Sequence, residues 1–147
     1  MRQIPSGAAH ERSITFPLEV DVTVAAARPV PLPAELRYDR SDPYAVRLSL
    51  GTHSPLTVDW VFARSLLADG LRVPVGIGDV LVVPRHRCRP EAIRIVLRSR
   101  TGSAVLEIAE SAVTAFLRQT EAVVPQGCEH HHIDLDDVVA RLTAGGD

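Results

Sequence analysis

The sequence predicts an α+β domain built on antiparallel sheet. Several segments alternate apolar and polar residues, a period of two that is typical of half-buried strands. The links between them have hairpin length, and segments with helical spacing come mainly after the strands instead of alternating with them, which argues against βαβ units. The chain has 147 residues, of which 46% are hydrophobic, enough for one domain with its own core.

The first half of the chain is expected to open with strands. Residues 1–12 show no periodicity and are predicted to be a flexible tail, so residues 13–147 form the single domain. Ile14–Val24 alternates as a strand, and Pro17 favours an edge or bulge near its start. Ala25–Pro33 is rich in proline and is predicted to be a connector.

The next segment predicts a hairpin followed by a short helix. Tyr44–Leu50 and Leu56–Phe62 alternate as strands, and the link between them, residues 51–55, has the composition of a turn. Residues 63–69 then read as a helix, which Gly70 ends at the position that follows a helix C-terminus.

Three more strands and two helices are expected in the second half. The strands are Val80–Val83, Ile93–Arg98 and Ala104–Ile108. A helix with one apolar stripe is predicted from about Ser111 to Thr120. Asp134 is predicted to cap a last helix, because carboxylates favour the first turn.

Composition predicts a cytoplasmic protein with reduced cysteines. Arg plus Lys total 16 against 18 Asp plus Glu, and the net charge of −2 gives no general attraction to nucleic acid or membranes. Cys88 and Cys128 are too few for a disulfide framework. The first 13 residues lack the apolar core of a signal peptide, and no apolar run reaches the roughly 20 residues of a membrane helix.

No catalytic signature is present, so we expect no enzyme and no cofactor. The chain has no G-x-S-x-G sequence, and Gly76-Ile77-Gly78-Asp79 opens a strand and lacks the third glycine of a dinucleotide loop. Cys88 lies between Arg87 and Arg89, which would lower its pKa if the three were close in space. The simpler interpretation is an exposed loop cysteine.

The run His130-His131-His132 suggests a metal site because histidine is a common ligand, but the spacing of the residues argues against one. Cys128 and Asp134 lie nearby, with His86 and Cys88 as more distant candidates. Adjacent histidines point in different directions, and neither C-x₂-C nor H-x₃-H occurs. We therefore expect no metal and interpret the run as a loop before the last helix.

An arginine-rich segment is the main electrostatic candidate. Its members, all within residues 85–100 and opposed there only by Glu91, are Arg85, Arg87, Arg89, Arg94, Arg98 and Arg100. Even spacing predicts that Arg94, Arg98 and Arg100 share one strand face, which could hold phosphates of a single-stranded nucleic acid. Aromatic residues are only 4% of the chain, which leaves few rings for stacking bases. The alternatives are a solvated outer face of the sheet, or a face paired with acidic residues of a neighbour.

The aromatic residues cluster between Leu36 and Leu71. Trp60 and Phe62 are predicted to be core residues, and Tyr38 and Tyr44 flank a turn where a phenol can keep its hydroxyl in water. The candidate partner-binding residues of this turn are Tyr38, Asp39, Arg40 and Asp42. An exposed turn can equally be a plain connection.

An ordered set of motifs extends along most of the chain, from about Leu18 to Leu142. The motifs are Pro33–Asp39, Asp42–Val46, Val58–Arg64, Leu66–Leu71, Gly76, Gly78, Asp79, Phe116–Thr120, Val124–Gly127, Glu129–His132, Asp134 and Leu135. In this order they resemble the SsgA-like proteins of sporulating actinobacteria, and within them the SsgB type.

The resemblance implies a regulator of sporulation-specific cell division without enzymatic residues. Such proteins are expected to mark septum sites in the cytoplasm and to recruit FtsZ, the tubulin-like GTPase, together with an SsgA-like membrane-associated partner. The implied architecture is a bell-shaped homotrimer related to whirly-type proteins that bind single-stranded nucleic acid. On this resemblance the arginine-rich face is a trimer interface, a partner surface or a remnant of nucleic-acid binding, and the sequence leaves these open.

Overall fold

The computed structural model describes residues 13–25, 27–52, 57–84, 89–132 and 142–143. Its elements are β1 (Ser13–Val24), β2 (Val30–Asp39), β3 (Ala45–Leu50), β4 (Val58–Ala63), α2 (Arg64–Asp69), β5 (Val75–Ile77), β6 (Val80–Val83), β7 (Ala92–Ser99), β8 (Gly102–Ala109), α3 (Glu110–Val123) and the 3₁₀ helix η1 (Glu129–His132). The predicted tail and the predicted last helix beginning at Asp134 lie outside the described residues, apart from two helical residues at 142–143.

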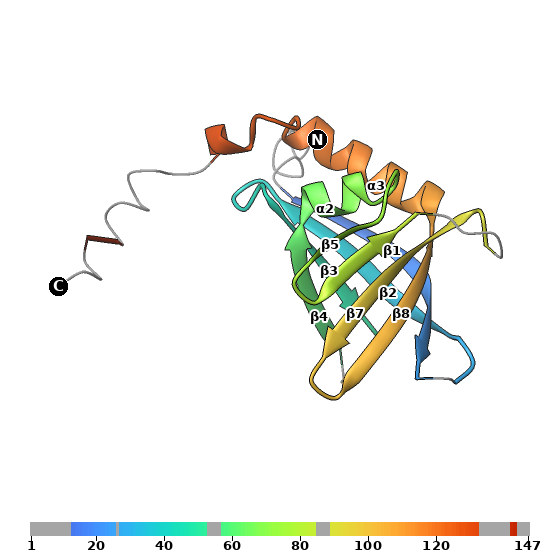
Figure 1. Ribbon diagram of the computed structural model, residues 1–147. Coiled ribbons are helices and arrows are strands. Elements are labelled where there is room, and N and C mark those ends of the chain that lie inside the picture. Colours follow the sequence, from blue (N-terminus) through green and yellow to red (C-terminus); the bar gives the residue numbers. More distant parts are fainter. Residues whose placement is uncertain (1–12, 26, 53–56, 85–88, 133–141, 144–147) are drawn as a thin grey trace.

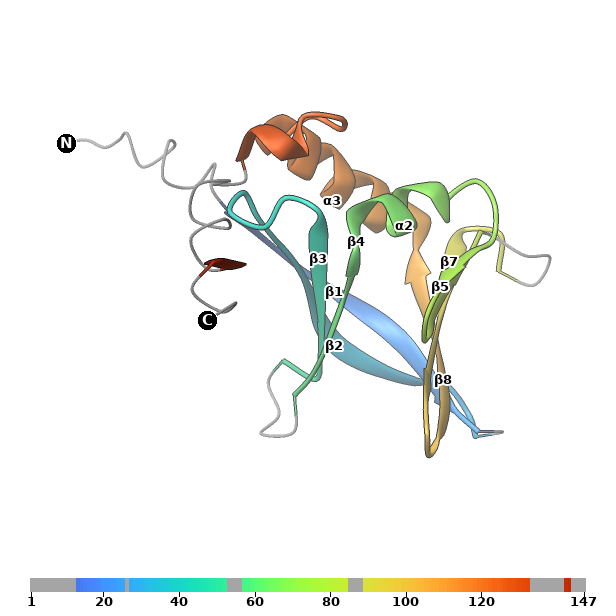
Figure 2. The ribbon, with the colours of Figure 1, turned by 60° about the vertical axis from the view of Figure 1, so that its left-hand side comes forward.

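All eight strands form one antiparallel sheet, in the order β4-β3-β2-β1-β8-β7-β6-β5. The sheet curves into a half-barrel, and α2 and α3 lie together across one end of it (Figures 1 and 2). Each run of four strands is followed by one helix, so the chain contains two successive units of the same plan. The first and last strands of this order, β4 and β5, are the sheet edges.

The core fills the concave side of the half-barrel beneath the helices. Core-facing residues of neighbouring strands are directly paired, for example Leu36 with Leu48 and Ile95 with Leu106. The apolar stripe of α3 closes this space, and Phe116 is fully buried with its ring edge-on to Phe16 at 6.0 Å. Such aromatic pairs stabilise a fold beyond the effect of burying their apolar area, so the geometry of this ring contact also fixes the position of α3.

The predicted α+β class and most elements are confirmed. The hairpin of β3 and β4, the strand Val80–Val83 and the helix α3 lie where the patterns place them. Pro17 lies inside β1, in the part that pairs with β2, whereas β8 pairs with β1 only from Asp21 onward. A proline is tolerated there because one side of the strand lacks a ladder partner.

Two segments differ from the prediction. The proline-rich connector is wrong in its second part, because β2 begins at Val30 and includes Pro31 and Pro33. Leu32 and Ala34 face the core and stabilise this strand by their burial, while the two prolines alternate with them and lie on the opposite face of the sheet. β5, with only three residues, has too short a pattern to be recognised.

Phe62 is buried, as predicted, and Trp60 is half-buried and packed against the same core. No helix among the described residues is long and apolar enough to span a bilayer.

Gly70 ends α2 as predicted, although its backbone is right-handed, with a φ of −66°. The requirement for glycine is therefore steric: a Cβ at this position would lie 2.2 Å from Cγ1 of Val82 on β6. The helix end packs against the opposite half of the sheet at a distance that only a missing side chain allows.

Gly70→Ala is expected to lower the free energy of unfolding by about 1 to 3 kcal/mol, the usual cost of overpacking. Val82→Ala removes Cγ1, the nearest atom, but leaves the Cβ of residue 82 at 2.5 Å from the added atom, so the clash should be relieved in part and the double variant should lose less than the sum of the two single losses. Urea denaturation of the four proteins measures this coupling. Strictly additive losses would contradict a clash between these two residues.

Candidate functional site

A buried guanidinium lies at the junction of the two helices. Arg64 begins α2, and its side chain is only 4% exposed. Its Nη1 donates to the backbone oxygens of Thr120 at 3.2 Å and Val124 at 2.7 Å, at the end of α3. Its Nη2 donates to Oε2 of Glu129 at 2.7 Å. One side chain therefore joins α2 to α3 and η1.

Glu129 completes this junction from the other side. Its Oε1 accepts a hydrogen bond from the backbone N–H of Gly127 at 2.8 Å, so both carboxylate oxygens are engaged. The hydrogen bond from Arg64 is the main cause that holds the pKa of Glu129 below its ordinary value. The segment after α3 is thereby fixed as a turn against the buried charge.

Tyr38 lies under the same guanidinium, with the Arg64 carbon Cζ 5.0 Å from the centre of its ring. The tyrosine is 2% exposed, and its hydroxyl donates to the backbone oxygen of Pro43 at 2.9 Å. Burial raises the pKa of Tyr38 to about 12. The prediction that the Tyr38 hydroxyl stays in water is therefore wrong, because it binds the backbone of the turn from the buried side. Tyr44, in contrast, is exposed.

The turn itself is stabilised by its own side chains. Oδ1 of Asp39 accepts from the backbone N–H of Ser41 at 2.8 Å and from its hydroxyl at 2.7 Å. The backbone N–H of Asp42 donates to the oxygen of Asp39 at 3.0 Å. Asp39 and Asp42 are exposed and Arg40 is half-buried, so these three predicted residues remain available at the surface.

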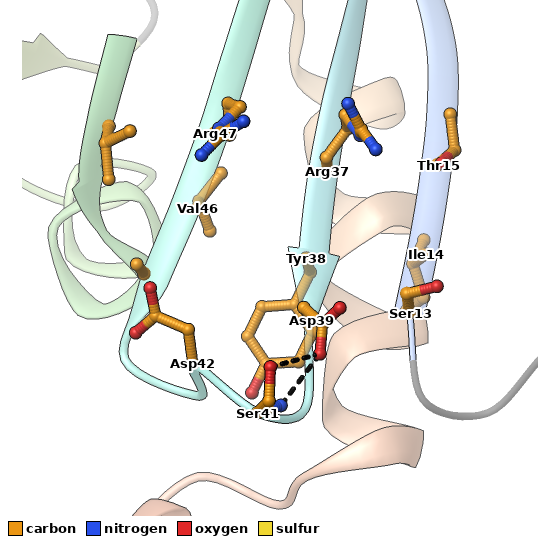
Figure 3. A pocket seen from close by; sticks show the side chains of 12 residues that line it. Ser13, Ile14, Thr15, Arg37, Tyr38, Asp39, Ser41, Asp42, Val46 and Arg47 are labelled. Carbon is orange, nitrogen blue, oxygen red and sulfur yellow. Dashed lines mark hydrogen bonds between the residues drawn. The ribbon is translucent and has the colours of Figure 1, made fainter.

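Beside the turn, the outer face of the sheet holds a cavity of about 260 Å³ (Figure 3). Its lining includes Arg37 and Asp39 of β2, Arg47 of β3, Thr15 of β1 and Val61 of β4. Figure 3 shows Arg37 and Arg47 at the same level on neighbouring strands, with Thr15 alongside. The cavity therefore combines exposed cations, hydroxyl groups and an apolar edge.

Two arginines of the arginine-rich segment, Arg89 and Arg94, are paired with carboxylates. Arg89 contacts Asp21 at 3.5 Å, Glu91 at 3.1 Å and Glu107 at 3.3 Å, and Nε of Arg94 lies 3.1 Å from Glu107. Glu91 is the only acidic residue within the segment itself, and Asp21 and Glu107 are contributed by strands that are distant in sequence and adjacent in the sheet.

The predicted shared face is also incomplete. Arg94 and Arg98 lie on β7, but Arg100 follows the end of this strand in the turn to β8. Arg85 and Arg87 lie outside the described residues. Of the four arginines of the segment that the structure describes, Arg89 and Arg94 are paired with carboxylates and Arg100 lies in a turn, so these four do not form the predicted cationic face.

The histidine run forms η1 and part of the helix junction. The rings of His130 and His131 have centroids 4.0 Å apart, and the N–H of His131 donates to the backbone oxygen of Cys128 at 3.1 Å. Among the residues that the structure describes, no group of three or more His, Cys, Asp or Glu side chains is arranged to hold a metal ion.

The ion pair between Arg64 and Glu129 is the main feature of the site that the sequence analysis does not predict. Arg64 precedes the apolar Leu66 and Leu67 at the start of a short helix, which is the one local signal for a buried arginine. Its partner is 65 positions away, and nothing in the spacing points to it.

The fold and the site together define a class of protein, a curved antiparallel half-barrel in which one buried arginine joins α2 to the end of α3 and to η1. The family model described as Streptomyces sporulation and cell division protein, SsgA, matches residues 32–129. The chain belongs to this SsgA family.

Curated relatives and solved structures agree. The sporulation-specific cell division protein SsgB of Streptomyces coelicolor is 42% identical over 132 residues, covering 90% of this chain and 96% of the relative. SsgB of Frankia casuarinae is 42% identical, covering 91% and 94%. The crystal structure of an SsgA-like sporulation-specific cell division protein from Thermobifida fusca has a TM-score of 0.78 at 35% identity, covering 88% and 94%. An SsgB structure from work on longitudinal division in sporulating Streptomyces coelicolor has a TM-score of 0.75 at 43% identity, covering 82% and 94%.

The buried ion pair predicts a specific acid sensitivity. Glu129→Gln should lower the free energy of unfolding at neutral pH by about 2 kcal/mol, since it removes a charge-assisted hydrogen bond. The pKa of Glu129 is lowered by folding, so its stabilisation is present above the ordinary value of 4.5 and is lost as the pH falls through the lowered folded value. The difference between wild type and variant should therefore shrink as the pH falls below 4.5.

Urea denaturation between neutral and acid pH measures this difference. Glu121→Gln is the matched control, because Glu121 is 48% exposed and 3.8 Å from Arg64, and it should have little effect at any pH. Equal losses for both variants, or a loss for Glu129→Gln that does not change with pH, would contradict this role of the buried pair.

Proposed function

We propose that this chain is a non-enzymatic regulator of sporulation-specific cell division that marks septum sites and recruits the tubulin-like GTPase FtsZ. The observation that carries the proposal is its similarity, over nine-tenths of its length, to proteins named sporulation-specific cell division protein SsgB. The proposed location is the cytoplasm at division septa, with an SsgA-like membrane-associated protein as a second partner. A regulator of this kind acts by binding other proteins, so its function depends on which parts of its surface are accessible to them.

Self-association as a homotrimer is part of this proposal. The edge strands β4 and β5 face each other across the open side of the half-barrel (Figure 2). Residues of both strands, among them Val61 and Ile77, line a cleft. Val58 and Val61 on β4 and Val73 and Ile77 at β5 expose more than half of their surface. Uncovered apolar edge strands favour pairing with another chain, which supports an assembly of several copies.

The exposed turn next to Tyr38 is a candidate contact for FtsZ. Asp39 stabilises the turn by accepting hydrogen bonds from the backbone N–H and the hydroxyl of Ser41, so Arg40 and Asp42 can be replaced without removing these two bonds. Both residues lie on a loop anchored by the buried Tyr38 hydroxyl, and such anchored loops commonly carry binding residues.

FtsZ assembled with GTP is expected to carry this protein into the pellet on sedimentation, and the filaments should change in amount or length. Replacing Arg40 and Asp42 together by Ala should weaken co-sedimentation about tenfold, the effect of losing about 1.4 kcal/mol. Arg98→Ala, on a different part of the surface, is the control. If the wild type neither pellets with FtsZ nor changes its filaments, direct recruitment is wrong.

Single-stranded nucleic-acid binding is the less favoured function, because Arg89 and Arg94 already have carboxylate partners. Fluorescence anisotropy with a labelled oligothymidylate should show no saturable binding at low salt. Binding that is tight at low salt and falls steeply as salt increases would instead support the nucleic-acid function, since release of counterions from phosphates has this signature.

A further inference from the structure

Two arginines stand directly opposite each other on the outer face of the half-barrel. The register pairs Arg37 of β2 with Arg47 of β3, and both side chains are exposed. Neither forms an ion pair with any acidic residue in the part of the chain that the structure describes. Arg89 and Arg94, at the other end of the sheet, illustrate the contrast, because they share the carboxylate of Glu107.

A cross-strand pair of like charges is unfavourable for the fold. Directly opposite residues have Cβ atoms about 5 Å apart, and like charges in this relation destabilise the sheet. A carboxylate placed between two such guanidinium groups would replace their repulsion by two attractions. The planar fork of each arginine matches a carboxylate, so the recognition would be directional as well as electrostatic.

The surroundings of the pair limit what can bind. Val61, 56% exposed, is directly paired with Arg47 on the adjacent edge strand and offers an apolar contact, and Thr15, paired with Arg37, offers a hydroxyl. Asp39 and Asp42 line the far end of the same cavity. These two carboxylates would repel a long polyanion that crosses this face, so the site favours a short segment with one or two acidic side chains.

We propose that Arg37 and Arg47 form a docking site for a short acidic peptide segment of a protein partner, with Val61 contacting an apolar side chain of that segment. The site rests on the cross-strand register, the missing carboxylate partners and the adjoining cavity. It is independent of FtsZ being the partner, so its failure and the failure of the recruitment model are separate results.

Nuclear magnetic resonance of the ¹⁵N-labelled full chain tests this site with the N-acetylated, C-amidated peptide Gly-Glu-Leu-Glu-Gly, which has two acidic side chains and one apolar side chain, at low salt. The Nε–H signals of Arg37 and Arg47 are expected to shift with one saturable binding curve. Arg37→Gln and Arg47→Gln should each weaken binding about tenfold, the usual effect of one charge-assisted hydrogen bond. Arg98→Gln and Arg100→Gln, which remove exposed arginines at other positions, should leave it unchanged.

Several results would overturn the proposal. These are the absence of saturable shifts at Arg37 and Arg47, and equal weakening by the control substitutions. Tighter binding of inorganic phosphate or of an oligothymidylate than of the peptide would assign the pair to phosphates. A changed sedimentation mass of Arg37→Gln or Arg47→Gln would assign it to contacts between copies. Circular dichroism of each variant confirms that the comparison is between folded proteins.

Discussion

The arrangement of both helices depends on one buried charge, the guanidinium of Arg64. Removing such a group from water costs several kcal/mol, so it is stable only where its donors are paired. Here two backbone oxygens of the α3 C-terminus and the carboxylate of Glu129 accept from it, and the ring of Tyr38 lies against it. These partners come from both four-stranded halves of the chain. The ion pair therefore couples the halves at the end where the helices cover the half-barrel, and Tyr38 extends this coupling to the turn that we propose contacts FtsZ.

Arginines in this protein fall into classes that composition cannot distinguish. Arg64 is buried and structural, Arg89 and Arg94 are neutralised at the surface, and Arg37 and Arg47 face solvent as an unneutralised pair. A net charge of −2 describes none of these environments. The density of arginine within residues 85–100 indicates a cationic surface, yet pairing across β1, β8 and β7 places carboxylates among them. Local pairing thus decides which charges remain open, and Arg37 and Arg47, which lie outside the arginine-rich segment, face each other across two strands without a carboxylate between them.

Much of the fold could be predicted from the sequence, because its strands alternate and its longer helix has one apolar stripe. The proline-containing start of β2 could not, since proline content hides an alternation that only the core-facing Leu32 and Ala34 reveal. The site was less predictable. Tyr38 was placed at the right turn with the wrong environment, because whether a phenol faces water or a carbonyl depends on Pro43 and Arg64 in three dimensions. The Arg64–Glu129 pair joins residues 65 positions apart, and no local pattern encodes such a contact.

The proposed surfaces adjoin one another, which has a consequence for assembly. Val61 lines both the cavity beside Arg47 and the cleft between the edge strands β4 and β5. If copies associate through the edges while an acidic segment docks at the arginine pair, the two contacts share this residue and cannot be energetically independent. Residues that share a contact generally show coupling energies of about 0.5 to 3 kcal/mol. An adaptor built in this way would bind its partner with an affinity that depends on its own assembly, so recruitment would respond to the local concentration of the protein at a division site.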